Sequence, residues 1–295
     1  DSEQTEYSMA FTIGVARETE PGENRVSMVP EVIGRLIKND FEVLVEAGAG
    51  ESAFISDDEY REVGAKIVSR EEIYSGADLV TRVHPPNAEE TTLLKSGGLL
   101  LSFLRPLDDP DGIRRLAETG VTSFSVELVP RITRAQKMDA LSAMAGLAGY
   151  MAVLVGARSL PKYFPLMTTA AGTMRPAKLL VLGAGVAGLQ AIATSRRLGA
   201  ITSGYDVRPV VREEVESLGA KFVELELETT EAAGAGGYAT ALAEDKAKRQ
   251  VELLTPHLAG SDVIISTALI PGRKAPMLIS EEAVKQMAAG SVIVD

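Results

Sequence analysis

The residues with the clearest chemical meaning lie in one glycine-rich turn. Residues 178–188 read KLLVLGAGVAG, in which Gly183, Gly185 and Gly188 form the pattern G-x-G-x-x-G before a helical stretch that begins at Val186. The first glycine permits a tight turn, the second lets the backbone approach a pyrophosphate, and the third lets the helix pack close to the strand. The start of such a helix attracts phosphate, so this turn predicts a dinucleotide-binding site.

A carboxylate follows the glycine-rich turn at the spacing that such a site requires. Asp206 ends the next apolar run, 18 residues after Gly188, and Val207 and Arg208 come directly after it. A carboxylate in this place accepts hydrogen bonds from the adenosine ribose and repels a 2′-phosphate. The residues therefore favour NAD(H) over NADP(H), although the Arg208 guanidinium can accept a phosphate. The alternative is a glycine-rich turn that binds nothing.

A third stretch is expected at the same edge of the sheet. Residues 267–273 read TALIPGR and follow an apolar run over 262–267. Because open α/β sheets bind ligands at the carboxyl ends of their strands, Thr267, Ala268 and Leu269 form either a wall of the cofactor site or a plain loop.

A further cluster of glycines lies in residues 229–240 and includes Gly237, next to Tyr238. Glycines at this density favour a loop. Tyr238 would either close over a ligand or lie on a plain surface loop.

A polar pattern opens the longest helical stretch. Gln136, Asp139 and Ser142 recur at intervals of three residues, which places them on roughly one face of a helix. Arg131, just before them, can pair with a phosphate or a carboxylate. These four residues are either a binding surface or an ordinary exposed first turn capped by Thr133.

Short apolar runs alternate with amphipathic stretches, a pattern typical of parallel α/β sheets. We expect two Rossmann-like domains with a cleft between them, joined by a long helix: residues 1–132, a linking helix and connection over 133–165, and an NAD-binding domain over 166–295. The expected strands cover residues 11–16, 41–46, 65–68, 78–83, 99–104, 121–127, 178–182, 201–205, 221–225, 262–267 and 291–294. The expected helices cover residues 29–38, 57–63, 89–95, 111–119, 133–160, 186–198, 211–218, 240–254 and 280–287, and residues 163–176 read as irregular chain.

Composition narrows the function classes. The 295 residues include 30 Lys and Arg against 41 Asp and Glu, and the net charge of −11 disfavours nucleic-acid binding. The chain has no cysteine, which excludes disulfides, thiolate catalysis and cysteine–zinc sites and fits an intracellular protein. His84, at a strand end, and His257, in a turn after Pro256, are far apart in sequence, so no metal site is predicted.

One stretch bears on membrane association. Residues 140–157 carry no charge, and their length reaches the lower limit for a spanning helix. Alanine, glycine and serine make up much of this stretch, which favours a buried helix of a soluble protein. Residues 1–8 are polar and acidic, unlike a signal peptide.

With these segments in place, the chain resembles the NAD(H)-binding domain I, or alpha subunit, of proton-translocating NAD(P) transhydrogenase, a family related to alanine dehydrogenase. The resemblance runs from about Phe11 to Asp295. Its most specific marks are residues 130–139, 147–150, 183–190, 205–208, 236–239 and 267–273.

The resemblance implies roles for single residues. Arg131 and Gln136 match the element that holds the nicotinamide end of NAD(H), and Gln136 would orient the ring for hydride transfer. Asp139 and Ser142 match neighbours in that pocket, and Tyr238 matches the tyrosine of a loop that closes on the nucleotide. The expected cofactor-binding residues are then Gly183, Gly185, Val186, Gly188, Asp206, Val207, Arg208, Gly237, Tyr238, Thr267, Ala268 and Leu269.

The resemblance also implies an enzyme that acts only with a partner. Hydride would pass directly from NADH to NADP⁺ on domain III, the NADP(H)-binding component, which sits on the membrane domain II of the beta subunit. Transfer in this family is coupled to proton translocation, and domain I is a homodimer. The expected location is the cytoplasmic side of the inner membrane, or the matrix side in mitochondria.

The sequence departs from the family in two places. The family continues beyond the last strand, so a fragment is expected, and Lys137 replaces a small polar residue.

Alanine dehydrogenase uses a lysine and a histidine where this chain has His84 and Arg105, and an arginine cannot titrate near neutral pH. The alternatives are an alanine-type dehydrogenase, which these replacements disfavour, and a non-catalytic NAD-sensing module.

Overall fold

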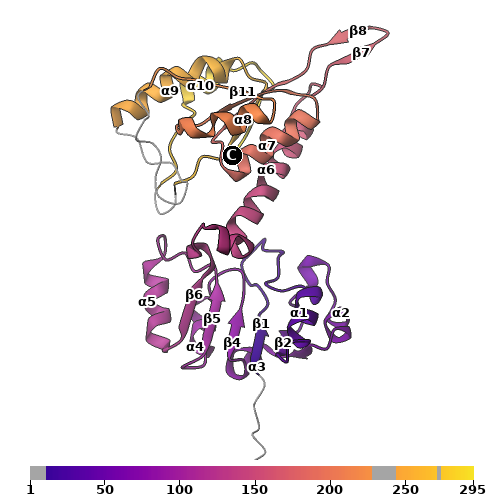
Figure 1. The fold of residues 1–295 in the computed structure, drawn as a ribbon, viewed down its shortest axis with the longest axis vertical. Coiled ribbons are helices and arrows are strands. Elements are labelled where there is room, and N and C mark those ends of the chain that lie inside the picture. The colour runs from indigo at the N-terminus through magenta and orange to yellow at the C-terminus, as the bar shows by residue number, and fades with distance from the viewer. Residues whose placement is uncertain (1–10, 228–243, 271–273) are drawn as a thin grey trace, which may run out of the picture. The chain divides into compact units, whose positions relative to one another are not determined.

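The computed structural model describes residues 11–227, 244–270 and 274–295. The chain divides into two compact units, residues 1–138 (unit 1) and residues 139–295 (unit 2), and each contains its own parallel sheet (Figure 1). The predicted α/β fold with two Rossmann-like parallel sheets is therefore confirmed. Gly237 and Tyr238 lie outside the described residues.

The sheet of unit 1 has the order β3-β2-β1-β4-β5-β6, and every pair of neighbours is parallel. Its order reverses between β1 and β4, the kind of switch point at which open α/β sheets bind ligands. The strands are β1 (Thr12–Val15), β2 (Glu42–Glu46), β3 (Lys66–Val68), β4 (Leu79–Thr81), β5 (Leu99–Ser102) and β6 (Thr122–Ser125).

The helices of unit 1 begin at clear capping signals. In the capping boxes of α2, α3 and α4, an N-cap side chain and a glutamate three residues later each accept a hydrogen bond from the other's backbone. Helix α3 is absent from the sequence-based expectation, although Ser69 and Glu72 carry its start signal. The α-helices in the described part of this unit are α1 (Pro30–Ile37), α2 (Asp57–Glu62), α3 (Arg70–Gly76), α4 (Ala88–Leu93) and α5 (Pro110–Thr119).

Alternating strand residues build a core on each face of the first sheet. Ile13 and Val15 of β1 pack in one cluster with Val43 and Val45 of β2. Leu44, between those two valines, packs in the other cluster with residues of α3, β4 and β5. The period of two along the strands therefore separates the two cores.

The sheet of unit 2 is also parallel, in the order β11-β10-β9-β12-β13, with its switch point between β9 and β12. The strands are β9 (Lys178–Leu182), β10 (Ile201–Tyr205), β11 (Lys221–Phe222), β12 (Val263–Ser266) and β13 (Val292–Val294). The helices after β9 are α7 (Val186–Arg197), α8 (Arg212–Ser217), preceded by the 3₁₀ turn η4 (Pro209–Val211), α9 (Glu244–Ala259) and α10 (Glu281–Gln286).

Helix α9 continues past its expected end. It runs through Pro256 and His257, so the prediction that His257 lies in a turn is wrong. Leu254 and Leu258, on either side of the proline, are both fully buried in the core of unit 2. Burial of these two side chains outweighs the local cost of one proline near the end of the helix.

The single long helix expected over 133–160 is two elements. A 3₁₀ helix, η3 (Thr133–Met138), ends unit 1, and α6 (Ala140–Ser159) begins unit 2. Asp139 is the N-cap of α6, and its carboxylate accepts a hydrogen bond from the backbone N–H of Ser142 at 2.9 Å. This cap starts a new helix, so the predicted continuous helical face through Gln136, Asp139 and Ser142 is wrong.

Glycines let α6 approach α7 closely. A Cβ on Gly149 would lie 2.0 Å from the carbonyl oxygen of Ala187, and Gly149, Val153 and Gly156 are buried. By length and composition alone α6 could cross a membrane, but in unit 2 it packs on α7, β12 and β13. The prediction of a buried helix holds for this face only, because four large apolar side chains are 43–52% exposed: Leu147, Tyr150, Met151 and Val155.

A hairpin replaces part of the predicted irregular chain. Strand β7 (Met167–Thr169) pairs antiparallel with β8 (Gly172–Met174), and Gly172 has a φ of 128° that favours glycine. The two strands extend away from the sheet of unit 2 (Figure 1). The sequence-based expectation of irregular chain over 163–176 is therefore wrong for these residues. The threonines of the two strands are their only local signal, because the remaining residues have low strand propensity.

Candidate functional site

The glycine turn, residues 183–188, joins the end of β9 to the start of α7 in unit 2. Gly183 has a φ of 93°, and its N–H donates to the carbonyl oxygen of Tyr205 at 2.8 Å. A Cβ on Gly188 would lie 1.8 Å from the carbonyl oxygen of Gly183, whereas a Cβ on Gly185 would meet nothing within 4 Å. The third glycine permits close packing and the second leaves the backbone open, which fits a pyrophosphate at the helix start.

The residues after β12 close one side of the glycine turn. The Thr267 hydroxyl donates to the carbonyl oxygen of Gly183 at 2.9 Å, and a Cβ on Gly183 would lie 3.0 Å from the backbone nitrogen of Ala268. These contacts favour a wall of the site over a plain loop. Leu269 is 64% exposed and Val186, the first residue of α7, is 40% exposed. Residues 271–273 lie outside the described residues.

Asp206, directly after β10, joins that strand end to the glycine turn. Its side chain is 5% exposed, and its Oδ2 accepts a hydrogen bond from the backbone N–H of Ala184 at 2.8 Å. Its Oδ1 accepts one from the backbone N–H of Arg208 at 2.9 Å. The Arg208 guanidinium adds hydrogen bonds of 2.9 Å from Nε to Oδ1 and 2.7 Å from Nη2 to Oδ2. Hydrogen bonding to Asp206 raises the pKa of the Arg208 guanidinium.

The interior beside Asp206 is also held by hydrogen bonds. Tyr205 is buried, and its hydroxyl accepts a hydrogen bond from Nε2 of Gln250 on α9 at 2.8 Å. Burial raises the pKa of Tyr205 to about 12, so this phenol stays neutral at physiological pH. Val207 packs against the same core. The carboxylate therefore lies on a rigid strand end that α9 supports.

The residues expected at the nicotinamide end fall on both sides of the unit boundary. Arg131 and Gln136 are exposed residues of unit 1, and Gln136 lies on η3. In unit 2, Asp139 and Ser142 bond to each other, with the Ser142 hydroxyl donating to Asp139 Oδ2 at 2.6 Å. Local spacing predicts a single helical face, but the N-cap at Asp139 interrupts it.

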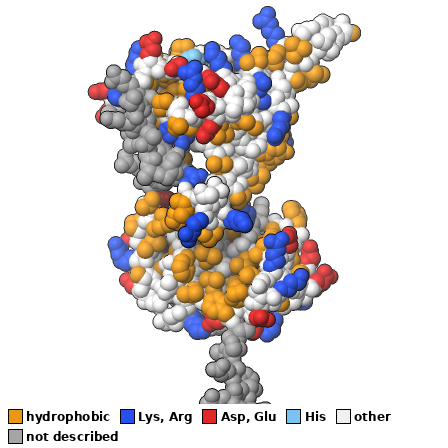
Figure 2. Space-filling model, in the orientation of Figure 1, with side chains coloured by type: hydrophobic (Ala, Val, Ile, Leu, Met, Phe, Trp, Pro, Cys, Tyr) orange, Lys and Arg blue, Asp and Glu red, His pale blue; other side chains and the backbone are white. Residues whose placement is uncertain are grey.

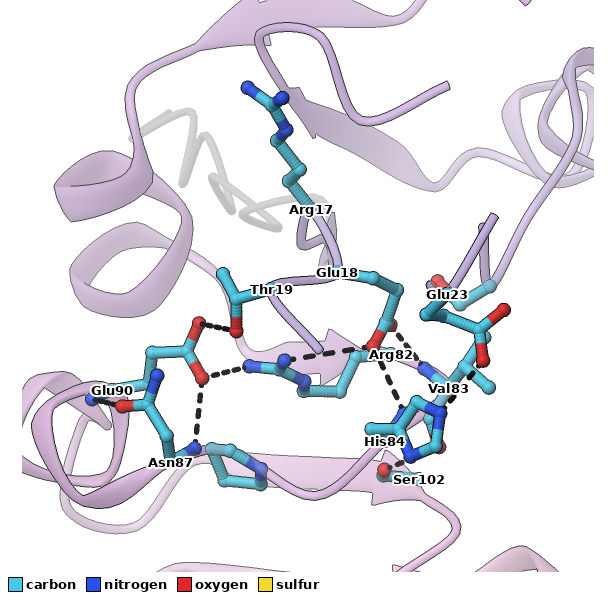
Figure 3. A network of polar contacts seen from close by, with 12 residues as sticks. Arg17, Glu18, Thr19, Glu23, Arg82, Val83, His84, Asn87, Glu90 and Ser102 are labelled. Carbon is cyan, nitrogen blue, oxygen red and sulfur yellow. Dashed lines mark hydrogen bonds and ion pairs between the residues drawn. The ribbon is translucent and has the colours of Figure 1, made fainter. Parts of the chain in front are cut away.

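A network of charged side chains that the sequence did not reveal lies at the switch point of unit 1 (Figure 3). Arg82, which follows β4, donates through Nη1 to Glu90 Oε2 at 2.5 Å and to the hydroxyl of Tyr74 at 2.7 Å. Glu18, after β1, accepts hydrogen bonds from the backbone N–H groups of Val83 at 2.5 Å and His84 at 3.1 Å. Arg82 thus pairs with Glu90 and, through Nη2 at 3.6 Å, with Oε2 of Glu18, and the three side chains are at most 3% exposed. Loss of one partner would leave a buried charge uncompensated.

His84 belongs to a second group of contacts in this network. Its Nε2 lies 2.7 Å from Glu23 Oε2 (Figure 3). Arg25 also donates to Glu23, through Nε at 2.8 Å and Nη2 at 2.6 Å. The hydrogen bonds from Arg25, helped by the one from His84, lower the pKa of Glu23 to about 2. His84 therefore has a structural partner, and within the described ranges no group of three histidines or carboxylates is placed to hold a metal ion.

Comparison with protein families assigns both halves of the chain. A model described as the alanine dehydrogenase/PNT N-terminal domain matches residues 14–148, and the C-terminal domain model of the same family matches residues 152–295. The chain is 46% identical to a subunit alpha polypeptide of the NAD(P) transhydrogenase of Rhodospirillum rubrum, over 96% of this chain and 76% of that protein.

Alanine dehydrogenases are more distant. The chain is 32% identical to alanine dehydrogenase 2 of Staphylococcus aureus, over 96% of this chain and 71% of that protein. Among solved structures, the transhydrogenase of Sinorhizobium meliloti gives a TM-score of 0.85 at 42% identity, covering 96% of this chain and 77% of that one. An L-alanine dehydrogenase gives 0.78 at 26% identity, covering 97% and 73%.

The two glycines of the turn should respond differently to an added methyl group. Gly188→Ala should lower the free energy of unfolding by about 3 kcal/mol, because the new Cβ collides with backbone. Gly185→Ala should leave stability within about 1 kcal/mol and weaken NADH binding at least tenfold, because its Cβ fills the open backbone. Urea unfolding and calorimetric titration with NADH measure both effects, and equal losses of stability would contradict the assignment.

The low pKa of Glu23 predicts an acid-sensitive contribution to stability. Its folded pKa of about 2 lies below the ordinary 4.5, so the stabilisation is complete above pH 4.5 and is lost as the pH falls toward 2. Between pH 7 and pH 3 the wild type should lose about 2 kcal/mol more unfolding free energy than Glu23→Gln. Glu31→Gln, at an exposed carboxylate paired with Arg35, is the control and should behave like the wild type. Equal losses in Glu23→Gln and the wild type would refute the assigned role of Glu23.

Proposed function

The chain belongs to the alanine dehydrogenase/PNT family, and from this premise we propose that it is the NAD(H)-binding component of a proton-translocating NAD(P) transhydrogenase. The observation that carries the proposal is the order of similarity. Identity is 46% to a transhydrogenase alpha subunit and 32% to an alanine dehydrogenase, each over 96% of the chain. The family binds nicotinamide nucleotides, and the chain is an oxidoreductase component.

The geometry of the glycine turn supports NAD(H) as the nucleotide. The open backbone at Gly185 leaves room for a pyrophosphate, and the carboxylate of Asp206 lies beside it for the ribose hydroxyls. We assign the pyrophosphate to Gly183, Gly185, Val186 and Gly188, the adenosine to Asp206, Val207 and Arg208, and one wall to Thr267, Ala268 and Leu269. Gly237 and Tyr238 stay predictions, since they lie outside the described residues.

The chain's own residues would position the nicotinamide rather than exchange protons with it. When bound, NADH supplies a hydride, which goes to NADP⁺ on the partner component. Arg131 and Gln136 would hold the carboxamide end, and the bonded pair Asp139–Ser142 would fix the neighbouring start of α6. The catalytic contribution is then orientation of the donor ring and exclusion of water.

The assembly follows from the same assignment. Relatives named as alpha subunits imply partner subunits and a membrane-associated enzyme. We propose the NADP(H)-binding domain III and the membrane domain II of a beta subunit as the partners. The protein would lie on the cytoplasmic side of the inner membrane, or on the matrix side in mitochondria. The net charge of −11 gives no support to a nucleic-acid partner.

The residues at the two positions that an alanine-type dehydrogenase would use give that alternative no support. His84 is bonded to Glu23, and position 105 is an arginine, a residue type that does not serve as a general acid or base. This alternative predicts NADH oxidation by pyruvate and ammonium. A non-catalytic NAD-sensing module, the second alternative, predicts NADH binding without hydride transfer to any partner.

A transfer assay tests the proposal. The chain is mixed with the NADP(H)-binding component of a transhydrogenase, NADH and an NADP⁺ analogue of distinct absorbance, and hydride should pass only when both proteins are present.

Gln136→Asn should slow transfer by about 10- to 100-fold while the Kd for NADH changes less than about threefold, because orientation rather than affinity is lost. Lys137→Gln, beside it on η3, should leave transfer unchanged. Equal loss of transfer and binding in Gln136→Asn would argue against its orienting role.

We further propose that the exposed face of α6 joins two copies of the chain. Leu147, Tyr150, Met151 and Val155 form a stripe at helical spacing. Apolar side chains gather on unit 2 at the base of the hairpin, whereas the hairpin itself is largely white (Figure 2). The stripe is uncharged, as is the whole of residues 140–157, so the face can pack against its own copy across a twofold axis.

The dimer predicts a measurable mass change. Light scattering after size exclusion should give twice 31.3 kDa for the wild type, and Met151→Glu should give 31.3 kDa, because it buries a charge in the interface. Leu107→Glu changes a residue of unit 1 that is 61% exposed and should stay dimeric. A dimeric Met151→Glu variant would exclude this face.

A further inference from the structure

The carboxylate of Asp206 has no free acceptor position in this structure. It accepts four hydrogen bonds, from the backbone N–H groups of Ala184 and Arg208 and from Nε and Nη2 of the Arg208 side chain. The distances are 2.7–2.9 Å, and a carboxylate offers about four lone-pair positions. The residue assigned to bind the adenosine ribose is therefore already saturated.

Only half of these hydrogen bonds can be exchanged without disturbing the fold. The two backbone donors belong to the glycine turn and to the chain after β10, so they hold the carboxylate in place. The two guanidinium bonds come from a side chain, which can change rotamer without moving the glycine turn or the end of β10. Ribose hydroxyls can therefore reach Asp206 only at the positions that the Arg208 guanidinium fills.

We propose that Arg208 is a displaceable latch on Asp206 and sets the preference between NAD(H) and NADP(H). The guanidinium must leave the carboxylate before the ribose diol binds, and this costs the charge-assisted pair. Once released, it remains beside the ribose and would face a 2′-phosphate, the group that Asp206 repels. Arg208 lines the adenosine site assigned above, but through this competition for Asp206 it opposes NADH binding and relieves the exclusion of NADPH. This proposal rests on the nucleotide site proposed above.

Replacement of Arg208 tests both halves of this proposal. Arg208→Met keeps an unbranched stem and removes every side-chain donor, so NADH should bind about three- to tenfold more tightly and NADPH at least tenfold more weakly. Arg208→Lys keeps the charge without the paired donors, so NADH should gain affinity and NADPH should lose less than in Arg208→Met. Calorimetric titration of each variant with NADH and NADPH gives the four dissociation constants, and a thermal melt establishes that the variant is folded.

Arg212→Met is the matched control for charge. Arg212, on α8, pairs with Glu216 and Glu224 at 3.0 and 3.1 Å, so this variant loses the same charge from the same unit without touching Asp206. Its Kd values should equal those of the wild type. If Arg208→Met matches Arg212→Met, or binds NADH more weakly than the wild type, the latch is refuted while the nucleotide site stands.

Asp206→Asn separates the latch from the site itself. It should weaken NADH binding at least tenfold if the ribose bonds to this side chain. If the wild type fails to bind NADH, or if Asp206→Asn leaves the Kd unchanged, the assigned site is wrong and the latch is overturned together with it.

Discussion

The candidate site depends on one carboxylate that joins two strand ends. Asp206, after β10, accepts a hydrogen bond from the backbone N–H of Ala184 in the turn after β9. This hydrogen bond fixes the turn relative to β10, and the close approach at Gly188 fixes it relative to α7. Because the turn is held from both directions, the open backbone at Gly185 keeps its place next to an acidic side chain. The proposed phosphate and ribose contacts thus share one support.

Unit 1 contains a similar carboxylate at a strand end, but it lacks the glycine turn of unit 2. Glu46, the last residue of β2, accepts a hydrogen bond from the backbone N–H of Arg17 after β1 at 2.8 Å and another from Arg70 Nε at 2.9 Å. This arrangement repeats the one at the end of β10. However, the connection from β1 to α1 contains one glycine, Gly22, and α1 begins only at Pro30, eight residues later. It therefore lacks the G-x-G-x-x-G spacing and offers phosphate no helix start next to the glycine.

Sequence predicts what is local and misses what tertiary contacts decide. Strands β9 and β10 have the expected bounds, because their apolar runs end at turn residues, and the spacing of the glycine turn is itself local. Helix α9 passes through Pro256 because burial on both sides compensates for it. The ion pair of Glu18 and Arg82 joins residues that only the strand order brings together. The pair of Asp206 and Arg208 is local in sequence but depends on rotamers, which residue types alone do not specify.

The composition of α6 follows from two different apolar surfaces. Gly149 lies against the backbone of α7, and a Cβ on Gly156 would lie 3.1 Å from Val263 of β12, so these two positions favour glycine, while Val153, between them in sequence, is fully buried. On other sides of the helix Leu147 and Val155 are large and exposed. Close packing on α7 and β12 requires small residues on the inner face of α6 only. If water covered the outer face, charged residues would be expected there. The dimer proposed above, in which a second copy covers the outer face, would account for the absence of charge over residues 140–157.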